Sequence, residues 1–463
     1  MKPICVDLDN TLIFADTMFL LWLQVLKKKP ILAFYAIFIF LFIGSAQAKH
    51  FLTCHGNLDI EHLPYNESLI IWLKKQKDNG HPIWLVTGCN QFIANRIALH
   101  LSFFDGVLAS DKQNNLVSQK KAMALKNHFA SFIYIGDHKQ DLAVWDIADE
   151  CGIVCHNKKP PFDRTFKYVF DRPQATLQTW CKLLRLDHWS KNLLLWIPLL
   201  IGYPMLNSNI LMLGCIATLC LCLLASVGYV INDALDLKED LTSKRHQNRP
   251  FVIGSIGIPK ALQASLALLL ITCILLVSLP LETSSLLVIY FIMTVLYSLI
   301  AKRLVMLDVF ILASLYGLRI EIGCSLIYSI CSPELSLSIL FICLGLACAK
   351  RFSDLTCLTY VDSEDKAYVH SDASLLSIMG IATSCIGVML ASDFLRHLIG
   401  SVNHFTKPNY LFLAIPLLLY WQFKLWYCAY HNQDLNEPVT FLKGQLETYV
   451  ISFLFLLILY FSI

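Results

Sequence analysis

The sequence predicts an α/β domain with a helical cap, followed by an all-α transmembrane bundle of about nine helices. Hydrophobic residues make up 56% of the 463 residues and charged residues only 15%, which is too apolar for a soluble protein of this size. Apolar runs before about residue 172 are short and alternate with charged segments, whereas later runs are long enough to cross a bilayer. We therefore expect an α/β domain over residues 1–172 and a membrane domain over residues 173–463.

Apolar segments of the first domain end in polar residues. Residues 3–8, 81–86 and 132–135 have the pattern of short buried strands, and helical patterns separate them. This alternation predicts a parallel sheet, whose functional site lies beyond the carboxyl ends of its strands. We expect the polar residues at these ends to converge, namely Asp7, Asp9, Thr87, Asp137 and Asp141.

A long insertion at about residues 16–65 predicts the helical cap. It contains Lys27, Lys28 and Lys29, followed by the run ILAFYAIFIFLFIG, which is shorter than the roughly twenty residues that a transmembrane helix needs. An apolar helix preceded by lysines suits a membrane surface with anionic headgroups. A cap helix that is buried within the protein is the alternative.

The motifs of the first domain resemble those of the haloacid dehalogenase-type phosphatases, which implies a Rossmann-like core. They comprise the segment Asp7-Leu8-Asp9-Asn10-Thr11, a strand that ends at Thr87, a lysine, and Gly136-Asp137 followed by Asp141. The resemblance covers about residues 1–165. A degenerate domain with a purely structural role is the other interpretation.

The resemblance to these phosphatases implies a role for each motif residue. Asp7 would be the nucleophile that takes the phosphoryl group, and Asp9 the acid/base. Thr87 and Lys121 would hold the phosphate oxygens, with Lys120 as an alternative to its neighbour. The implied Mg²⁺ ligands and their support are Asp7, Asp137 and Asp141.

The second domain contains about nine apolar runs of spanning length. They lie near residues 193–207, 209–231, 258–280, 283–300, 306–326, 334–352, 373–391, 408–430 and 446–463. Basic residues concentrate in alternate loops, so the positive-inside rule predicts a multi-pass protein of a bacterial-type inner (plasma) membrane with a cytoplasmic N-terminal domain. The first residues enter a strand pattern and not a signal peptide, which agrees with this orientation.

Two features of composition limit the function further. The 17 cysteines stand singly without the spacing of a zinc site, which predicts small buried side chains in a reduced compartment. The net charge of +3 is small, and we expect no nucleic-acid partner.

The segment from Asn232 to Pro250 is the strongest candidate site of the second domain. If it is helical, Asp233, Asp236 and Asp240 project from one face, directly after an apolar run. Three carboxylates on one face suit Mg²⁺, which commonly bridges carboxylates to substrate phosphates. Candidate substrate contacts beside them are Asn232, Lys244 and Arg249. A solvated cytoplasmic loop is the alternative.

Further polar residues near the ends of apolar runs are candidate substrate contacts. They are Lys191, Tyr297, Lys302, Asp308 and Arg351. Cations and an aromatic residue at these positions also suit membrane anchoring, but an acid such as Asp308 at the edge of a span favours a metal or phosphate contact.

Residues 180–463 resemble the UbiA-type intramembrane prenyltransferases, with the motif NDxxDxxxD at the second span. The opening Arg185-x-x-His188-Trp189-x-Lys191-Asn192 is similar to the decaprenyl-phosphate phosphoribosyltransferase branch, and Leu312 stands where ordinary members carry a second acidic motif. The segment after Asp240 departs from that branch, because it lacks His-Pro before Lys244. Ala301 also stands where leucine is usual.

The resemblance to this branch implies transfer of 5-phosphoribosyl from phosphoribosyl diphosphate to a polyprenyl phosphate, with Mg²⁺ on the diphosphate. We hypothesise that the fused phosphatase removes the 5-phosphate from the lipid-linked product. The alternatives are a prenyltransferase that uses a polyprenyl or other prenyl diphosphate with an aromatic or other acceptor, and a non-enzymatic membrane transporter or scaffold.

Overall fold

The computed structural model describes residues 1–156, 160–201, 206–243, 246–327, 332–356, 368–401, 407–431 and 446–462. The chain folds into two compact units. The first comprises Met1–Leu184 together with Tyr229–Leu266, and the second comprises Arg185–Gly228 together with Ala267–Ile463. Segment 229–266 of the predicted membrane domain therefore belongs to the same unit as the N-terminal residues.

The first unit contains a six-stranded parallel sheet with the strand order β3-β2-β1-β4-β5-β6. The strands are β1 (Ile4–Val6), β2 (Ile83–Asn90), β3 (Gly106–Ser110), β4 (Ile133–Gly136), β5 (Glu150–His156) and β6 (Tyr168–Arg172). All three residues of the central strand β1 are buried, as expected for a parallel strand covered on both faces. The predicted α/β fold with a parallel sheet is confirmed.

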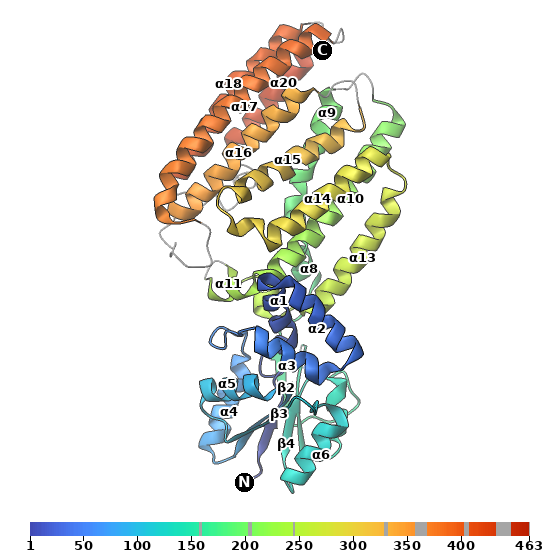
Figure 1. Ribbon diagram of the computed structural model, residues 1–463, viewed down its shortest axis with the longest axis vertical. Coiled ribbons are helices and arrows are strands. Elements are labelled where there is room, and N and C mark those ends of the chain that lie inside the picture. Colours follow the sequence, from blue (N-terminus) through green and yellow to red (C-terminus); the bar gives the residue numbers. More distant parts are fainter. Residues whose placement is uncertain are drawn as a thin grey trace. The chain divides into compact units, whose positions relative to one another are not determined.

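Helices cover the sheet on both sides. They are α4 (Glu67–Asp78), α5 (Gln91–Leu101), α6 (Ser118–His128) and α7 (Leu142–Trp145). Figure 1 draws α4 and α5 on one side of the strands and α6 on the other. Asn90 is the last residue of β2 and the N-cap of α5. Its Oδ1 accepts a hydrogen bond from the Phe92 amide at 3.0 Å. Trp145 is fully buried and donates from Nε1 to the carbonyl of Gly152 at 3.2 Å.

Three helices between β1 and α4 occupy the segment in which the sequence predicts a cap. They are α1 (Thr17–Lys28), α2 (Pro30–Phe42) and α3 (Ser45–His55). Asp16 caps α1 by accepting a hydrogen bond from the Phe19 amide at 3.1 Å. Pro30 begins α2 at the position where a missing N–H is tolerated. The turn from α2 to α3 uses Gly44 at φ +138°, a conformation that favours glycine.

Segment 229–266 packs against the N-terminal residues inside the first unit. It contains the end of α10 (Ser208–Leu235), then α11 (Leu237–Thr242), α12 (Pro250–Ile253) and the start of α13 (Ile258–Leu276). Helix α12 contacts α8 (Leu177–Leu183). A Cβ atom on Gly254, which has φ +74°, would lie 2.2 Å from the Cβ of Phe14, so this close approach requires glycine.

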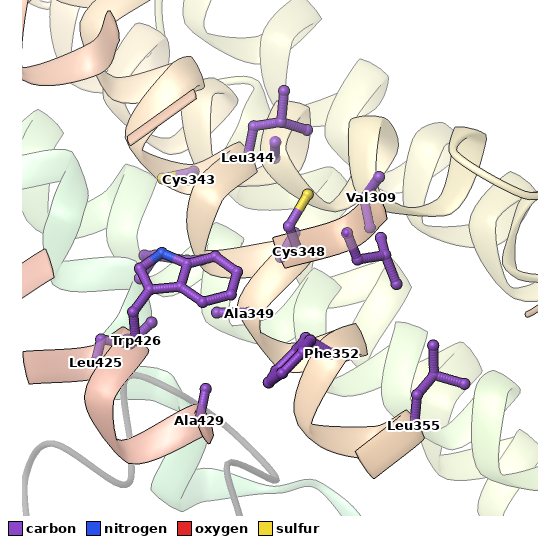
Figure 2. Close-up of a cluster of buried hydrophobic side chains, with 14 of the residues drawn as sticks. Val309, Cys343, Leu344, Cys348, Ala349, Phe352, Leu355, Leu425, Trp426 and Ala429 are labelled. Atoms are coloured by element: carbon purple, nitrogen blue, oxygen red, sulfur yellow. The ribbon is translucent and has the colours of Figure 1, made fainter. Parts of the chain in front are cut away.

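The second unit is helical. Besides the remainder of α10 and α13 it contains η2 (Leu186–Leu195), α9 (Trp196–Ile201), α14 (Leu281–Leu299), α15 (Leu307–Cys324), α16 (Pro333–Thr356), α17 (Ala373–Ser401), α18 (Ala414–Tyr430) and α20 (Leu446–Ser462). Figure 2 shows part of its core, where Trp426 of α18 lies near Ala349 and Phe352 of α16. A Cβ atom on Gly380 of α17 would lie 2.3 Å from the Trp426 ring, so a small residue is required there.

Six helices among the described residues are long and apolar enough to cross a membrane, so the prediction of about nine is wrong in number. They are Ser208–Leu235, Ile258–Leu276, Leu281–Leu299, Pro333–Thr356, His370–His397 and Asn409–Tyr430. Residues 193–201 of the predicted run at 193–207 are divided between η2 and the short α9. Helix α15 carries the charges of Asp308, Arg319 and Glu321. Helix α20 has only 17 residues. The mean hydropathy of a sequence segment predicts a span but does not detect such charges and helix ends.

The prediction that the cysteines are reduced is wrong at Cys324, which is disulfide-bonded. Cys324 ends α15, whereas Asp308 lies in its first turn. Disulfides persist in oxidising compartments.

Candidate functional sites

Three carboxylates converge at the carboxyl edge of the sheet. Asp7, Asp137 and Asp141 each offer an oxygen atom within 4.8 Å of the others. Asp7 follows β1 and Asp137 follows β4, and these neighbouring strands end at the same edge because they pair in parallel. Asp141 lies in the 3₁₀ turn η1 (Lys139–Asp141), where its Oδ2 accepts the amide hydrogens of Asp137 and His138 at 3.2 Å. An all-carboxylate set of this size fits Mg²⁺.

The structure separates the two neighbouring lysines of α6. Lys121 is 3% exposed, and its Nζ lies 3.0 Å from Oδ2 of Asp7 and 3.4 Å from Oδ1 of Asp141. Lys120 is exposed. The buried ammonium also lies 2.9 Å from the hydroxyl of Tyr134, which donates to Asp141 Oδ1 at 2.6 Å. Of the two lysines, only Lys121 has its charge at the carboxylate cluster.

Three of the acids at this edge, Asp7, Asp9 and Asp137, have raised pKa values because they are buried. Burial raises the pKa of Asp7 to about 6, although the ammonium of Lys121 opposes the shift. Burial and the nearby Asp16 raise the pKa of Asp9 to about 7. Burial and the carboxylates of Asp7 and Asp141 hold the pKa of Asp137 well above its ordinary value. A cation between these acids would favour their charged forms.

Asp9 and Thr87 are held by local hydrogen bonds at the same edge. Asp9 accepts from the amide of Thr17 at 2.9 Å and from its hydroxyl at 3.2 Å, so the start of α1 orients this carboxyl. Thr87 on β2 is fully buried, and its Oγ1 accepts from the Cys89 amide at 3.0 Å. The strand-end residues that the sequence predicts to converge therefore lie on neighbouring strands and the loops that follow them.

Two cations at this edge were missed by sequence reasoning. Arg172 on β6 places Nη1 3.8 Å from Asp137 Oδ2 and donates from Nη2 to Asn10 Oδ1 at 2.9 Å. It also lines a surface groove of about 340 Å³ with Phe14 and Tyr65. Lys49 on α3 donates to the carbonyl of Gly88 at 2.6 Å. Neither has a motif signal, because both approach through tertiary contacts.

The acidic segment after α10 is helical with an interruption at Asp236, which precedes α11. Asp233 and Asp240 are each 3% exposed. Nη1 of Arg249 lies 3.2 Å from Oδ1 of Asp233 and 2.5 Å from Oδ2 of Asp240. Nδ1 of His246 lies 2.8 Å from the other oxygen of Asp240. Asp233 and Asp240 thus lie close together, as predicted, beside one guanidinium nitrogen.

Asp236 points to a different partner. Its Oδ1 lies 3.8 Å from Nζ of Lys27 at the end of α1, and Lys27 also forms an ion pair with Glu239. A lysine of the predicted cap therefore reaches the acidic segment within the first unit. The sequence pattern predicts that Lys27 faces lipid headgroups, and the contact with Asp236 and Glu239 carries no signal in that pattern.

The candidate residues near α15 form a separate cluster within the second unit. Asp308 is fully buried and accepts from Arg351 Nε and from the Tyr368 hydroxyl, each at 2.5 Å. Arg351 also donates from Nη2 to the hydroxyl of Tyr297 at 2.9 Å. The structure therefore brings together three predicted residues, Tyr297, Asp308 and Arg351, and adds Tyr368.

A second buried arginine of this unit was not among the candidates. Arg319 of α15 is 5% exposed and donates from Nε to Asn192 Oδ1 at 3.0 Å and from Nη2 to the Tyr290 hydroxyl at 2.9 Å. Asn192 lies on η2 beside the candidate Lys191, which is 7% exposed. Arg319 thus ties η2 to α14 and α15.

The remaining candidates are Asn232, Lys302 and Lys244. Asn232 on α10 and Lys302 on η5 (Ala301–Arg303) are half-buried. Lys244 lies outside the described residues, as do the basic loop residues Arg245, Lys366 and Lys443.

Comparison with known proteins matches residues 194–457, more than half of the chain, to the UbiA prenyltransferase family. The chain belongs to this family. The UbiA-family chain is accordingly a multi-pass membrane protein with a transferase fold.

Relatives of this UbiA-family chain include one that extends over both domains. The uncharacterized protein y4nM of Sinorhizobium fredii is 27% identical over 450 residues, which cover 95% of this chain and 87% of that protein. The nodulation protein NoeC of Azorhizobium caulinodans is 25% identical over 52% of this chain and 80% of that protein. A UbiA homolog from Archaeoglobus fulgidus, bound to GPP and Mg²⁺, is 15% identical with a TM-score of 0.45 over 61% of this chain and 98% of that one.

Proposed function

We propose that this UbiA-family protein is a Mg²⁺-dependent transferase that moves 5-phosphoribosyl from phosphoribosyl diphosphate to a polyprenyl phosphate. The observation that carries the proposal is the approach of Asp233 and Asp240 to one cationic atom of Arg249 at the end of a candidate span. Two buried carboxylates that share a cation suit a divalent ion that bridges them to a diphosphate. In this arrangement Arg249 would move from the carboxylates to the diphosphate.

The proposal assigns roles by the chemistry of each side chain. Asp233, Asp236 and Asp240 would hold Mg²⁺, which supplies positive charge to the leaving diphosphate when bound. Lys244, Arg249 and Lys302 would stabilise the charge that develops as the anomeric bond breaks. The candidates for other substrate contacts are Lys191, Asn232, Tyr297, Asp308 and Arg351.

The donor in this proposal is a sugar diphosphate because the second acidic motif is missing. Leu312 stands four residues after Asp308, where a carboxylate would complete that motif. In addition, Asp308 is paired with Arg351 and Tyr368. Transfer of a prenyl group from a prenyl diphosphate is the alternative, and the choice of donor distinguishes the two reactions.

We further propose that the N-terminal domain is a phosphatase of the haloacid dehalogenase type. A carboxylate oxygen of Asp7 would attack the phosphorus atom, and the leaving alcohol would take its proton from Asp9. Water, deprotonated by Asp9, would then release inorganic phosphate from Asp7. Lys121 and Thr87 would bind the phosphate oxygens, and the 4.8 Å cluster of Asp7, Asp137 and Asp141 supports a Mg²⁺ site.

The proposed orientation places the acidic segment and the N-terminal domain in the cytoplasm of a bacterial-type cell. Basic residues in alternate loops support it.

A product assay tests both activities. Purified full-length protein in detergent receives Mg²⁺, polyprenyl phosphate and either phosphoribosyl diphosphate or a prenyl diphosphate, and the lipid products are analysed by mass. We expect a dephosphorylated ribosyl lipid from wild type, and the 5-phosphorylated lipid to accumulate with Asp7→Asn. Product from prenyl diphosphate alone would contradict the sugar donor. An identical lipid, with its phosphate in place, from wild type and Asp7→Asn would contradict the coupled phosphatase.

A further inference from the structure

Helix α2 exposes an unusually apolar surface. Its residues PILAFYAIFIFLF contain no charge, and only Ala33, Ala36 and Ile39 are buried. These three follow one narrow stripe that packs toward α1 and α3. The rest of the helix and the residue after it leave large apolar side chains exposed by 38% to 83%, namely Ile31, Phe34, Tyr35, Ile37, Phe38, Phe40, Leu41, Phe42 and Ile43.

The start of α2 is located beside the end of a candidate span. Lys27, three residues before Pro30, forms ion pairs with Asp236 and Glu239, and α10 ends at Leu235. Gly254, four residues before the span α13, contacts Phe14 in the same unit. Because spans end near the membrane surface, these contacts place the beginning of α2 at that surface.

The length and charge of α2 define how it can meet lipid. Thirteen residues extend about 20 Å, which is less than the hydrocarbon core of about 30 Å. A helix of this length lies in the interface and does not cross the membrane. Lys28 and Lys29 are exposed directly before it, where they can meet anionic headgroups. Exposed aromatic side chains such as Tyr35 suit the same layer.

We propose that α2 is an interfacial membrane anchor, embedded by its exposed apolar face in the headgroup and acyl boundary of the bilayer. The anchor holds the edge of the N-terminal sheet near lipid. Helix α1 begins at Thr17, which binds Asp9, and α3 carries Lys49, which binds the Gly88 carbonyl next to Thr87. The helices that flank α2 thus contact both sides of the carboxylate edge. A site held in this way is suited to phosphate groups borne by membrane lipids.

Lipid cross-linking of the full-length protein tests the anchor. The protein is reconstituted in vesicles of phosphatidylethanolamine and phosphatidylglycerol that contain a phospholipid with a photoactivatable acyl chain, and adducts are mapped by mass spectrometry. We expect adducts in the peptide over residues 30–43, as in the span α14. Peptides of α4 and α5 should have none, although Ile71 and Leu99 there are 68% and 84% exposed. Absence of adducts on α2 in a sample in which α14 is labelled would overturn the proposal.

Matched substitutions give a second measurement. Phe38→Asp with Leu41→Asp places charges on the exposed face of α2, whereas Ile71→Asp with Leu99→Asp places the same number of charges on exposed apolar sites of α4 and α5. The first pair should lower adducts on α2 to the level of α4, and the second pair should leave them unchanged. An unchanged level of adducts with the first pair would also count against the anchor. These readouts do not depend on either proposed enzymatic activity.

Discussion

The Nη1 atom of Arg249 lies 2.5 Å from Oδ2 of Asp240, and the same atom lies 3.2 Å from Oδ1 of Asp233. Arg249 follows Asp240 by nine positions and Asp233 by sixteen positions in the sequence. One guanidinium therefore links the end of a candidate span to the segment that follows it. Two of the acids in the motif NDxxDxxxD, Asp233 and Asp240, therefore form ion pairs with the same nitrogen atom.

Asp240→Asn should lower transferase activity by at least about tenfold, which corresponds to about 1.4 kcal/mol, because it removes a charge from the proposed metal site. Glu239→Gln is the matched control, since it removes a neighbouring carboxylate that pairs with Lys27 and not with Arg249. Product formation at several Mg²⁺ concentrations measures the effect. Equal losses from the two substitutions would exclude a specific role for Asp240.

Lys121→Met should abolish phosphatase activity, with a loss of about a hundredfold or more, because a buried positive charge leaves the carboxylate cluster. Lys120→Met should leave the activity nearly unchanged, because that side chain is exposed. Release of inorganic phosphate from a soluble phosphate ester gives the comparison. Activity that depended on Lys120 and not on Lys121 would refute the proposed site.

Without Mg²⁺, the carboxyl edge should become less stable as the pH rises from about 4 to 7. The pKa values of Asp7 and Asp9 in the folded state, about 6 and about 7, exceed the ordinary value of 3.8. Such groups bind protons more tightly when folded, so their contribution to stability is complete at low pH and is lost as the pH passes the folded pKa values.

Hydrogen exchange of peptides over residues 4–8 and 133–141 of the full-length protein measures this pH effect. Mg²⁺ should increase protection more at pH 7.5 than at pH 5, because it binds the charged carboxylates. Asp137→Asn should remove most of the Mg²⁺ response. Equal protection by Mg²⁺ at both pH values would argue against a carboxylate metal site.

Asp308→Asn should destabilise the second unit by about 3 kcal/mol, because it leaves the guanidinium of Arg351 without its buried carboxylate partner. Adding Arg351→Gln should recover part of the loss, since the pair is then removed together. Thermal unfolding of the four proteins in one detergent yields the coupling between the two positions. Additive losses would show that the pair has no structural role.

Local patterns determined the order of elements and the chemistry of several sites. Alternating short apolar runs predicted the parallel sheet, and pairing of β1 with β2 and β4 accounts for the nearness of Asp7, Thr87 and Asp137. Motif spacing was sufficient here because the carboxyl ends of adjacent parallel strands share one edge. Windows of hydropathy located most of the spans but overestimated their number, because they ignore charges such as Arg319 and breaks in helical structure.

Tertiary structure alone decided which side chains meet across distant segments. The sequence favoured Lys121 through the resemblance to the phosphatases and kept Lys120 as an alternative, and burial of Lys121 on α6 distinguished the two side chains. Sequence spacing gives no signal for three of the ion pairs. They are Lys27 with Asp236, Arg172 with Asp137, and Arg351 with Asp308. The physical reason is that composition and periodicity specify which face of an element is apolar, whereas the partner of a buried charge depends on how the elements pack.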